Sequence, residues 1–428
     1  MSGPGIRYYH LAAELGRDLE VTLVAPGAGN AEIPNVETLS LADASAERMR
    51  QLAGYDVVIT RPLRLEIGRR LARDGARLIF DLYVPILSEQ LAALTVQPEH
   101  HAAAIFHRMA MLDVRHALVT GDAFVCASER QRNFWLGMLA MLGRLEVDRY
   151  AEDPTLRGLI DVVPFGVAQD PPRADVPVLK GVVPGIAPED SVLLWGGGVW
   201  NWLDPLTPIR AVAELAHRRD DVKLVFMALR HPDVVMASAA ERAVELAQSL
   251  GVFDTHVFFN ERWVDYAGRN AFLFEADLGV SAHYDTLETR YAYRARLLDY
   301  FWAGLPTVTT RGDVLGDLVG ERGLGRALAP EEVDEWVAAI EELLDDDGER
   351  RRVAHGLAEL RAELSWANAA APLRRLVHGE PSGRPPLLRS GVLEAESLAL
   401  RAEAAYSIGG MRGMVSRRLA KVAGSVRR

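Results

Sequence analysis

The sequence predicts an α/β protein made of two Rossmann-like domains, and three observations lead to this fold class. Short apolar runs of strand length alternate with segments of helical spacing along most of the 428 residues. Glycine-rich segments occur near the start of each half, at residues 3–5 and 196–198, as in phosphate-binding loops. The stretch at residues 168–188 is rich in Pro, Asp and Gly and is typical of a linker. A chain of this length is too long for one hydrophobic core, so two domains are expected.

Composition and charge exclude several classes of protein. The chain is 49% hydrophobic and 25% charged, which is ordinary for a globular protein. A net charge of −11 argues against nucleic acid as the main partner. The single cysteine, Cys126, allows no disulfide within the chain and fits a cytoplasmic protein. No apolar run reaches membrane-spanning length, the first ten residues do not read as a signal peptide, and no standard metal-binding spacing occurs, so no metal is expected.

In the first half, polar residues follow the predicted strands. Strands are expected at residues 20–25, 55–60, 76–80 and 123–127. Arg61 follows the second of these strands, and Asp81 and Tyr83 follow the third. Ligands of open α/β sheets bind outside the carboxyl ends of the strands, so these three side chains are candidate ligand contacts. An Asp after a strand is as often a plain helix cap, and that alternative stays open for Asp81.

The first glycine loop contains Gly3 and Gly5, ahead of a predicted helix at residues 6–15. Backbone N–H groups in such a loop bind phosphate; the alternative is a flexible N-terminus. A Rossmann-like domain places a strand before this loop. We therefore expect about 8–15 further residues upstream, and an unpaired edge beside the strand at 20–25.

The second glycine loop follows a strand expected at residues 191–195 and consists of Gly196, Gly197 and Gly198. Three glycines let backbone N–H groups approach a phosphate closely. The loop itself carries no cation. The positive charge would come from Arg230, which follows a strand at 222–227, or from Arg294.

The most informative stretch is residues 276–313, predicted as strand 278–281, helix 288–302 and strand 307–310. His283 and Asp285 lie in the loop before the helix. Three arginines stand within the first turns of the helix, namely Arg290, Arg294 and Arg296. Cations at that end oppose the helix dipole, and a bound diphosphate would account for them. The alternative is a solvated basic face paired with Asp285, Glu288 and Asp299.

Residues 296–308, RLLDYFWAGLPTV, resemble the K-x-x-E-x-x-A-x-G-x-P-V-V segment of retaining GT-B glycosyltransferases, family 4 in particular. Pro164-Phe165-Gly166-Val167 is similar to the segment that ends the N-terminal domain in that family. The resemblance implies two Rossmann-like domains facing a cleft, with a C-terminal helix crossing back to the first domain. The expected parts are an acceptor-side domain at 1–170, a hinge at 171–188, a nucleotide-sugar-binding domain at 189–357, a cross-over helix at 358–377 and a tail at 378–428.

The resemblance also implies roles for individual residues. Asp299 matches the family glutamate that holds the ribose hydroxyls, and Arg296 matches a family lysine. The other family glutamate would be residue 291, which is Tyr291 here. The groups that could replace it in catalysis are Glu288, Asp285 and His283. The remaining candidates are Trp263 and Val264 in the base pocket and Arg61, Asp81 and Tyr83 on the acceptor side.

The predicted function is therefore transfer of a sugar from a nucleotide-sugar donor to a hydroxyl acceptor, which could be a glycan, lipid-linked or small-molecule compound. The resemblance further implies retention of configuration, no cofactor or metal, and cell-envelope polysaccharide synthesis. Three alternatives remain: a nucleotide-sugar 2-epimerase-like enzyme, an NAD-dependent dehydrogenase, and a non-catalytic sugar-nucleotide-binding protein. The dehydrogenase lacks support because there is no G-x-G-x-x-G followed by an acidic residue.

The C-terminal residues 411–428 carry six cations, no acid and apolar residues at helical spacing. This pattern predicts a helix on an anionic membrane surface, and hence a cytoplasmic protein peripheral to the inner face of the membrane. The alternative is a helix that docks on the acidic surface of the enzyme itself.

Overall fold

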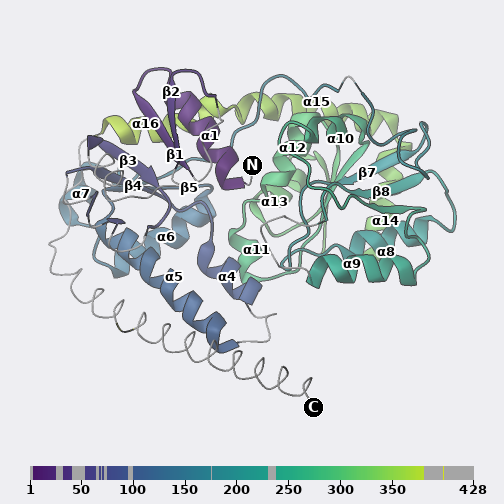
Figure 1. Ribbon diagram of the computed structural model, residues 1–428, viewed down its shortest axis with the longest axis horizontal. Coiled ribbons are helices and arrows are strands. Elements are labelled where there is room, and N and C mark those ends of the chain that lie inside the picture. Colours follow the sequence, from purple (N-terminus) through teal and green to yellow (C-terminus); the bar gives the residue numbers. More distant parts are fainter. Residues whose placement is uncertain are drawn as a thin grey trace, which may run out of the picture. The chain divides into compact units, whose positions relative to one another are not determined.

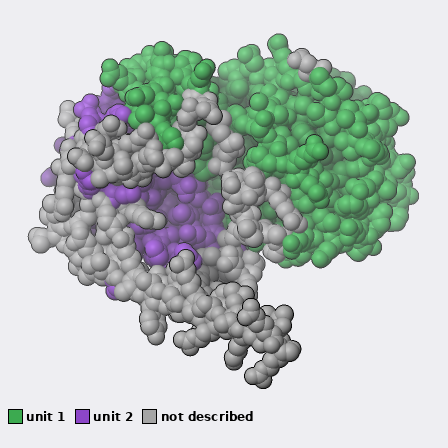
Figure 2. All heavy atoms as spheres, viewed as in Figure 1, with its two compact units in different colours: residues 1–43, 162–375 green, residues 44–161, 376–428 purple. Residues whose placement is uncertain are grey.

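The computed structural model describes residues 3–25, 32–40, 54–63, 67–68, 70–71, 75–94, 100–174, 176–229, 238–379 and 399. The chain divides into two compact units (Figure 2). One comprises residues 1–43 and 162–375, and the other residues 44–161 and 376–428. Arg230 and the tail at 411–428 lie outside the described residues.

The first unit is built on a six-stranded sheet with the order β12-β11-β10-β7-β8-β9 (Figure 1). All five strand pairs are parallel. The strands are β7 (Ser191–Trp195), β8 (Val222–Phe226), β9 (Val257–Phe259), β10 (Leu278–Ser281), β11 (Thr307–Thr310) and β12 (Gly325–Leu328). Strands β7, β8 and β10 are largely apolar and buried, as expected for a parallel sheet covered on both faces.

Helices cover both faces of this sheet, with α8 and α14 packed together on one side and α10 and α12 on the other (Figure 1). The helices are α8 (Leu206–Leu215), α9 (Ser238–Ser249), α10 (Arg269–Glu275), α11 (Leu287–Tyr291), α12 (Ala295–Ala303), α13 (Val314–Arg322), α14 (Val333–Asp345), α15 (Asp347–Glu363) and α16 (Trp366–His378). The core between β7, β8 and α14 includes Trp195, Phe226 and Trp336, all fully buried. The chain leaves β7 toward β8 and later returns to β10 on its other side, so β7 and β10 flank the topological switch point, where such sheets bind ligands.

The same unit contains α1 (Gly3–Leu15), β1 (Val21–Ala25) and β2 (Val36–Ser40). Strand β1 pairs with β2 in parallel. Gly3 and Gly5 form the first turn of α1, so the prediction of a loop at residues 3–5 was wrong. Pro4 explains the difference, since proline favours the first turn of a helix.

The second unit contains a four-stranded sheet with the order β3-β4-β5-β6. Its strands are β3 (Val57–Thr60), β4 (Arg77–Asp81), β5 (Ala123–Cys126) and β6 (Ile160–Val162), and its helices are α4 (Ile86–Leu94), α5 (His100–Thr120), α6 (Glu129–Met141) and α7 (Val147–Glu152). Strands β3, β4 and β5 pair in parallel. The strands follow the alternation predicted from the sequence.

Two predicted helices differ from the structure. The helix expected at 288–302 is interrupted, because Ala292 has an extended backbone and separates α11 from α12. The cross-over helix expected at 358–377 is interrupted, because α15 ends at Glu363 and α16 begins at Trp366, so the break precedes Pro372, which lies inside α16. In the part of the chain that the structure describes, no helix combines the length and the apolar character needed to cross a membrane.

Candidate functional site

The loops after β7, β10 and β11 meet at one edge of the six-stranded sheet, because these strands are parallel neighbours. The loop after β7 is the glycine triplet 196–198, that after β10 leads into α11, and that after β11 is residues 311–313. The residues predicted to bind the donor are mostly in these loops and in α12. The topology thus places the glycine triplet and the loops after β10 and β11 at the same carboxyl edge.

Tyr300 of α12 fixes the glycine triplet. Its hydroxyl accepts a hydrogen bond from Gly196 N–H at 2.7 Å. It also lies 2.9 Å from the carbonyl oxygens of Leu194 and Val280, to one of which it donates. Burial raises the pKa of Tyr300 to about 12, so the hydroxyl remains neutral. The ring packs on Gly279 of β10, where a Cβ would lie 2.4 Å from the ring carbon Cγ.

Sequence reasoning missed Tyr300, although a glycine inside a buried strand is a signal of close approach. Gly197, the next residue of the triplet, has a φ of 78° in the left-handed region that favours glycine. Because Gly196 N–H is already bonded to Tyr300, only the remaining amides of the triplet can serve a ligand.

Arg296 connects α12 with the glycine triplet. Its Nη2 donates to the carbonyl oxygen of Gly198 at 2.9 Å, and the guanidinium lies over the Trp195 ring at 5.0 Å. Among the described residues, Nη1 has no hydrogen-bond partner. Burial, rather than the neighbouring Arg294, is the main reason that the pKa of Arg296 falls to about 10, and the group stays cationic at neutral pH. No described carboxylate forms an ion pair with this side chain.

Arg294 and Glu288 form a buried bidentate ion pair. The two N–O distances are 2.9 and 2.6 Å, and the exposed fractions of the side chains are 7% and 1%. Arg294 stands at the N-cap of α12, and Glu288 lies in the first turn of α11, so the pair holds the two short helices together. Each charge is compensated by the other, which favours a structural role for both.

His283 is fully buried and paired with Asp313. Its Nε2 lies 3.0 Å from Asp313 Oδ2 and 3.1 Å from the carbonyl oxygen of Thr310. Asp313 caps α13, because its Oδ1 accepts from Leu315 and Gly316 N–H. Burial opposes ionisation of Asp313, but the His283 hydrogen bond holds the pKa of its carboxyl below the usual value. His283 lies in the loop after β10, as predicted, and it is buried there because the cap leaves Asp313 with a second oxygen that needs a buried donor.

Asp285 and Arg290 are exposed. Arg290 stands in the last turn of α11, where a cation is favoured by the helix dipole. The expected conflict between this cation and the dipole therefore does not arise, because the interrupted helix places Arg290 at a C-terminal end.

Asp299 is bound by a residue that sequence reasoning missed. Arg269 Nε donates to Asp299 Oδ1 at 3.1 Å. The Arg269 guanidinium lies between two rings, 3.6 Å from the centroid of Tyr266 and 4.8 Å from that of Trp302. Burial raises the pKa of Asp299, and the Arg269 cation opposes that effect. Trp263 and Val264 are half-buried in the segment between β9 and α10 that leads to Arg269.

Near the chain start, Arg7 of α1 is fully buried. It donates to the carbonyl oxygen of Pro164 at 3.1 Å, and its guanidinium lies 5.1 Å from the Phe165 ring centroid. This cation is thus engaged with the backbone of the segment that ends the first half of the chain. Gly3 and Gly5 lie half-buried in the first turn of the same helix.

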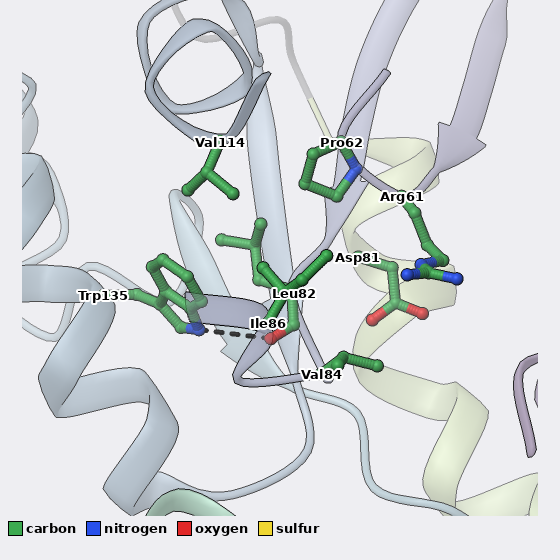
Figure 3. A pocket seen from close by; sticks show the side chains of 8 residues that line it. All are labelled: Arg61, Pro62, Asp81, Leu82, Val84, Ile86, Val114 and Trp135. Carbon is green, nitrogen blue, oxygen red and sulfur yellow. Dashed lines mark hydrogen bonds between the residues drawn. The ribbon is translucent and has the colours of Figure 1, made fainter. Parts of the chain in front are cut away.

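In the second unit, a small hollow of about 10 Å³, with room for roughly one water molecule, lies at the carboxyl ends of β3 and β4 (Figure 3). Arg61 and Asp81 stand on one side of it, and Trp135 and Val114 on the other. Its other lining residues are Pro62, Leu82, Val84 and Ile86. The structure therefore brings Arg61 and Asp81 together, as their positions after neighbouring strands predicted.

Tyr83 does not line this hollow. It is buried, and its carbonyl oxygen accepts from Gln131 Nε2 at 2.8 Å. Its N–H donates to Asp81 Oδ1 at 3.3 Å, so Asp81 also makes the local turn contact that the capping alternative anticipated.

Comparisons with known proteins agree with this architecture. No family model matches the chain. It is 26% identical over 196 residues to the D-inositol 3-phosphate glycosyltransferase of Corynebacterium diphtheriae. That match covers 46% of this chain and 44% of the relative, so it spans less than half of either protein.

Solved structures match over most of the chain. Sucrose-phosphate synthase from Thermosynechococcus elongatus has a TM-score of 0.61 at 15% identity, covering 88% of this chain and 92% of its own. WaaG, a glycosyltransferase involved in lipopolysaccharide biosynthesis, also gives 0.61 at 15% identity, with 89% and 97% covered. HepE from Anabaena in complex with UDP and glucose gives 0.60 at 13% identity, with 89% and 98% covered. The chain has the GT-B fold of glycosyltransferases, which confirms the predicted fold class.

Proposed function

We propose that this protein is a glycosyltransferase that moves a sugar from a nucleotide-sugar donor to a hydroxyl acceptor. The observation that carries the proposal is the glycine triplet at the carboxyl edge of the six-stranded sheet, beside the switch point between β7 and β10, with Arg296 bound to it three residues before Asp299 on α12. The GT-B fold and the partial match to an inositol phosphate glycosyltransferase support it. Residues 189–357 would be the donor-binding domain, with the hinge at 171–188.

The donor site would bind the nucleotide in three places. The amides of the glycine triplet and the Arg296 cation would hold the diphosphate, with Arg230 a further candidate outside the described residues. Asp299 would accept hydrogen bonds from the ribose hydroxyls, and Trp263 and Val264 would contact the base. UDP is the first nucleotide to test, since HepE was solved with UDP.

Charge stabilisation would carry most of the catalysis. When the glycosidic bond to the phosphate breaks, negative charge develops on the leaving diphosphate. A cation that is already in place and partly shielded from water stabilises this charge more than water does, since it needs no reorganisation. Arg296 suits this role because it is held at the glycine triplet and forms no ion pair with a described carboxylate. Assignment to family 4, and the retention of configuration that goes with it, belong to the same proposal and require no metal or cofactor.

We propose that either Glu288 or Asp285 contacts the donor sugar. The Asp285 side chain is exposed, whereas the Glu288 carboxylate forms an ion pair with Arg294. His283 is buried against Asp313, which does not favour the 2-epimerase alternative, because that alternative needs acid–base groups open to substrate.

The acceptor would bind at the hollow lined by Arg61 and Asp81, and Asp81 would orient the attacking hydroxyl. Tyr83 would hold the Asp81 carboxylate in place through its backbone N–H, which donates to Oδ1. The apolar lining beside these two charges suits an acceptor with an apolar portion. A glycan, a lipid-linked sugar and a small natural product all remain within the proposal, as does synthesis of cell-envelope polysaccharide.

We further propose that residues 411–428 bind an anionic membrane surface on the cytoplasmic side. Six cations would each contribute about 1 kcal/mol near such a surface. Flotation with anionic liposomes, with and without these residues, tests the proposal. The full chain is expected to float and the truncated chain to remain at the bottom; equal behaviour would rule it out.

The proposed transferase activity is tested with a panel of UDP-, GDP-, ADP- and dTDP-sugars, by measuring released nucleoside diphosphate with and without hydroxyl acceptors. Release that depends on one donor, and that Asp299→Ala abolishes or weakens, supports the proposal. Binding of a donor with no turnover would support the non-catalytic alternative, whereas binding of none of them would exclude both.

A further inference from the structure

The Arg269 side chain is held in place by two aromatic rings and a backbone carbonyl oxygen. Its guanidinium lies between the Tyr266 and Trp302 rings, and its Nη1 donates to the carbonyl oxygen of Tyr266. Only its Nε faces Asp299, at 3.1 Å. A planar guanidinium that packs against two rings and is hydrogen-bonded at one edge has little freedom to turn its remaining N–H groups. The contact to Asp299 is therefore directional and not a loose ion pair.

The Tyr266 and Trp302 rings are themselves held by residues from other parts of the chain. Tyr266 OH lies 3.1 Å from His10 Nε2 of α1, and the His10 ring stacks on Trp366 of α16 at 4.6 Å and 12°. Burial, followed by the Arg269 charge, lowers the pKa of His10 to about 4, so the ring is neutral at neutral pH. On the other side, Trp302 Nε1 donates to the carbonyl oxygen of Asp170 at 2.5 Å. Segments that are distant in the sequence thus meet at this one arginine.

We infer that Arg269 is the positioning residue of the Asp299 carboxylate, which it orients toward the ribose hydroxyls of the donor. The inference rests on the proposed function. A carboxylate binds a diol well only when both hydroxyls find acceptor lone pairs in a fixed place, and an aspartate with no partner rotates and protonates more readily when buried. Arg269 engages Oδ1 by one N–H, which uses only part of the acceptor capacity of the carboxylate.

The electrostatics around Asp299 agree with this role. The 260–268 segment contributes Tyr266, α10 contributes Arg269, α12 itself contributes Arg296 and Tyr300, and α15 contributes Arg361, which donates to the Trp302 carbonyl. Strand β10, which also packs on α12, carries no titratable side chain. Of these groups, Arg269 opposes the effect of burial most strongly, so its removal should make nucleotide binding depend on pH.

Calorimetry with UDP and 2′-deoxy-UDP tests the inference, using the ADP and GDP pairs in the same way if the uridine pair does not bind. The proteins are the wild type, Arg269→Gln, Arg269→Lys, Asp299→Asn and the matched control Arg218→Gln, an exposed arginine remote from the site in sequence. The wild type and the control are expected to prefer the ribonucleotide by about tenfold or more, the scale of a hydrogen bond to a charged group. Arg269→Gln should lose most of this preference.

The pH profile separates positioning from general damage. Relative to the wild type, Arg269→Gln should lose more affinity for the ribonucleotide at pH 6 than at pH 8, because the carboxyl protonates more easily, and Arg269→Lys should recover part of the loss. Asp299→Asn should vary with pH only as the terminal phosphate of the nucleotide does, which titrates at about pH 6. If the wild type binds the nucleotide and both Arg269 variants keep the same preference for ribose, the inference is wrong but the proposed function stands. Failure of the wild type to bind any nucleoside diphosphate would overturn the proposed function and the inference with it.

Discussion

At the residue scale, charged side chains with similar sequence positions have different surroundings in the structure. Arg294 and Arg296 are two residues apart, yet Arg294 is neutralised by Glu288 and Arg296 contacts a carbonyl oxygen. The sequence identified both cations and the nearby acids. It could not show which pairs form, because the pairing depends on the break at Ala292.

The spacing makes this dependence clear. Residues six apart in an unbroken helix lie about 9 Å apart along the axis and on different faces, so Glu288 and Arg294 could not form a bidentate contact there. The interrupted backbone brings them together, and the buried pair in turn stabilises the interruption. The sequence did not reveal the roles of Tyr300 and Arg269 either, because their hydrogen-bond partners lie far away in the sequence.

The Glu288–Arg294 pair gives a prediction for stability. Glu288→Gln or Arg294→Gln alone should lower the free energy of unfolding by about 3–5 kcal/mol, because each leaves the other charge buried and uncompensated. The double substitution should cost less than the sum of the two. A double-mutant cycle by urea denaturation measures this coupling; additive effects would mean that the two side chains do not interact.

At the element scale, the strands were predicted well and one helix was not. The predicted strands at 191–195, 278–281 and 307–310 coincide with β7, β10 and β11. Buried parallel strands are short apolar runs bounded by turn residues, so the sequence marks them directly. The helix at 288–302 was mispredicted because no Gly or Pro marks the break.

The packing of α12 on β10 gives a second prediction. Gly279→Ala would place a methyl group inside the Tyr300 ring contact, where Cβ would lie 2.4 Å from Cγ. Displacement of the ring should cost about 1–3 kcal/mol of stability and should also disturb Gly196, whose N–H depends on the Tyr300 hydroxyl. Thermal melting and nucleotide binding are measured together.

Tyr300→Phe is the matched control, since it keeps the ring on Gly279 and removes only the hydroxyl. It should weaken nucleotide binding with a smaller loss of stability than Gly279→Ala. If Gly279→Ala melts like the wild type, the close contact between strand and ring is not as described.

At the scale of the whole molecule, length and the linker composition predicted a two-part α/β protein, and the fold class is confirmed. The sequence could not show that residues 1–43 group with residues 162–375. That grouping depends on contacts between distant segments, such as Arg7 with the Pro164 carbonyl, and Arg374 Nη2 with the Glu14 carbonyl at 2.6 Å. No local pattern in either segment encodes such contacts.

The most direct test of the account is the affinity of Arg296→Ala for the nucleoside diphosphate that the wild type binds, measured by calorimetry beside the surface control Arg218→Ala. We predict that Arg296→Ala weakens binding by about tenfold to a hundredfold, the scale of a hydrogen bond between charged groups, whereas Arg218→Ala binds like the wild type. Unfolding temperatures measured in parallel show whether the variants are folded. A folded Arg296→Ala protein that binds the nucleotide as tightly as the wild type would contradict the assignment of the donor site to this edge of the sheet.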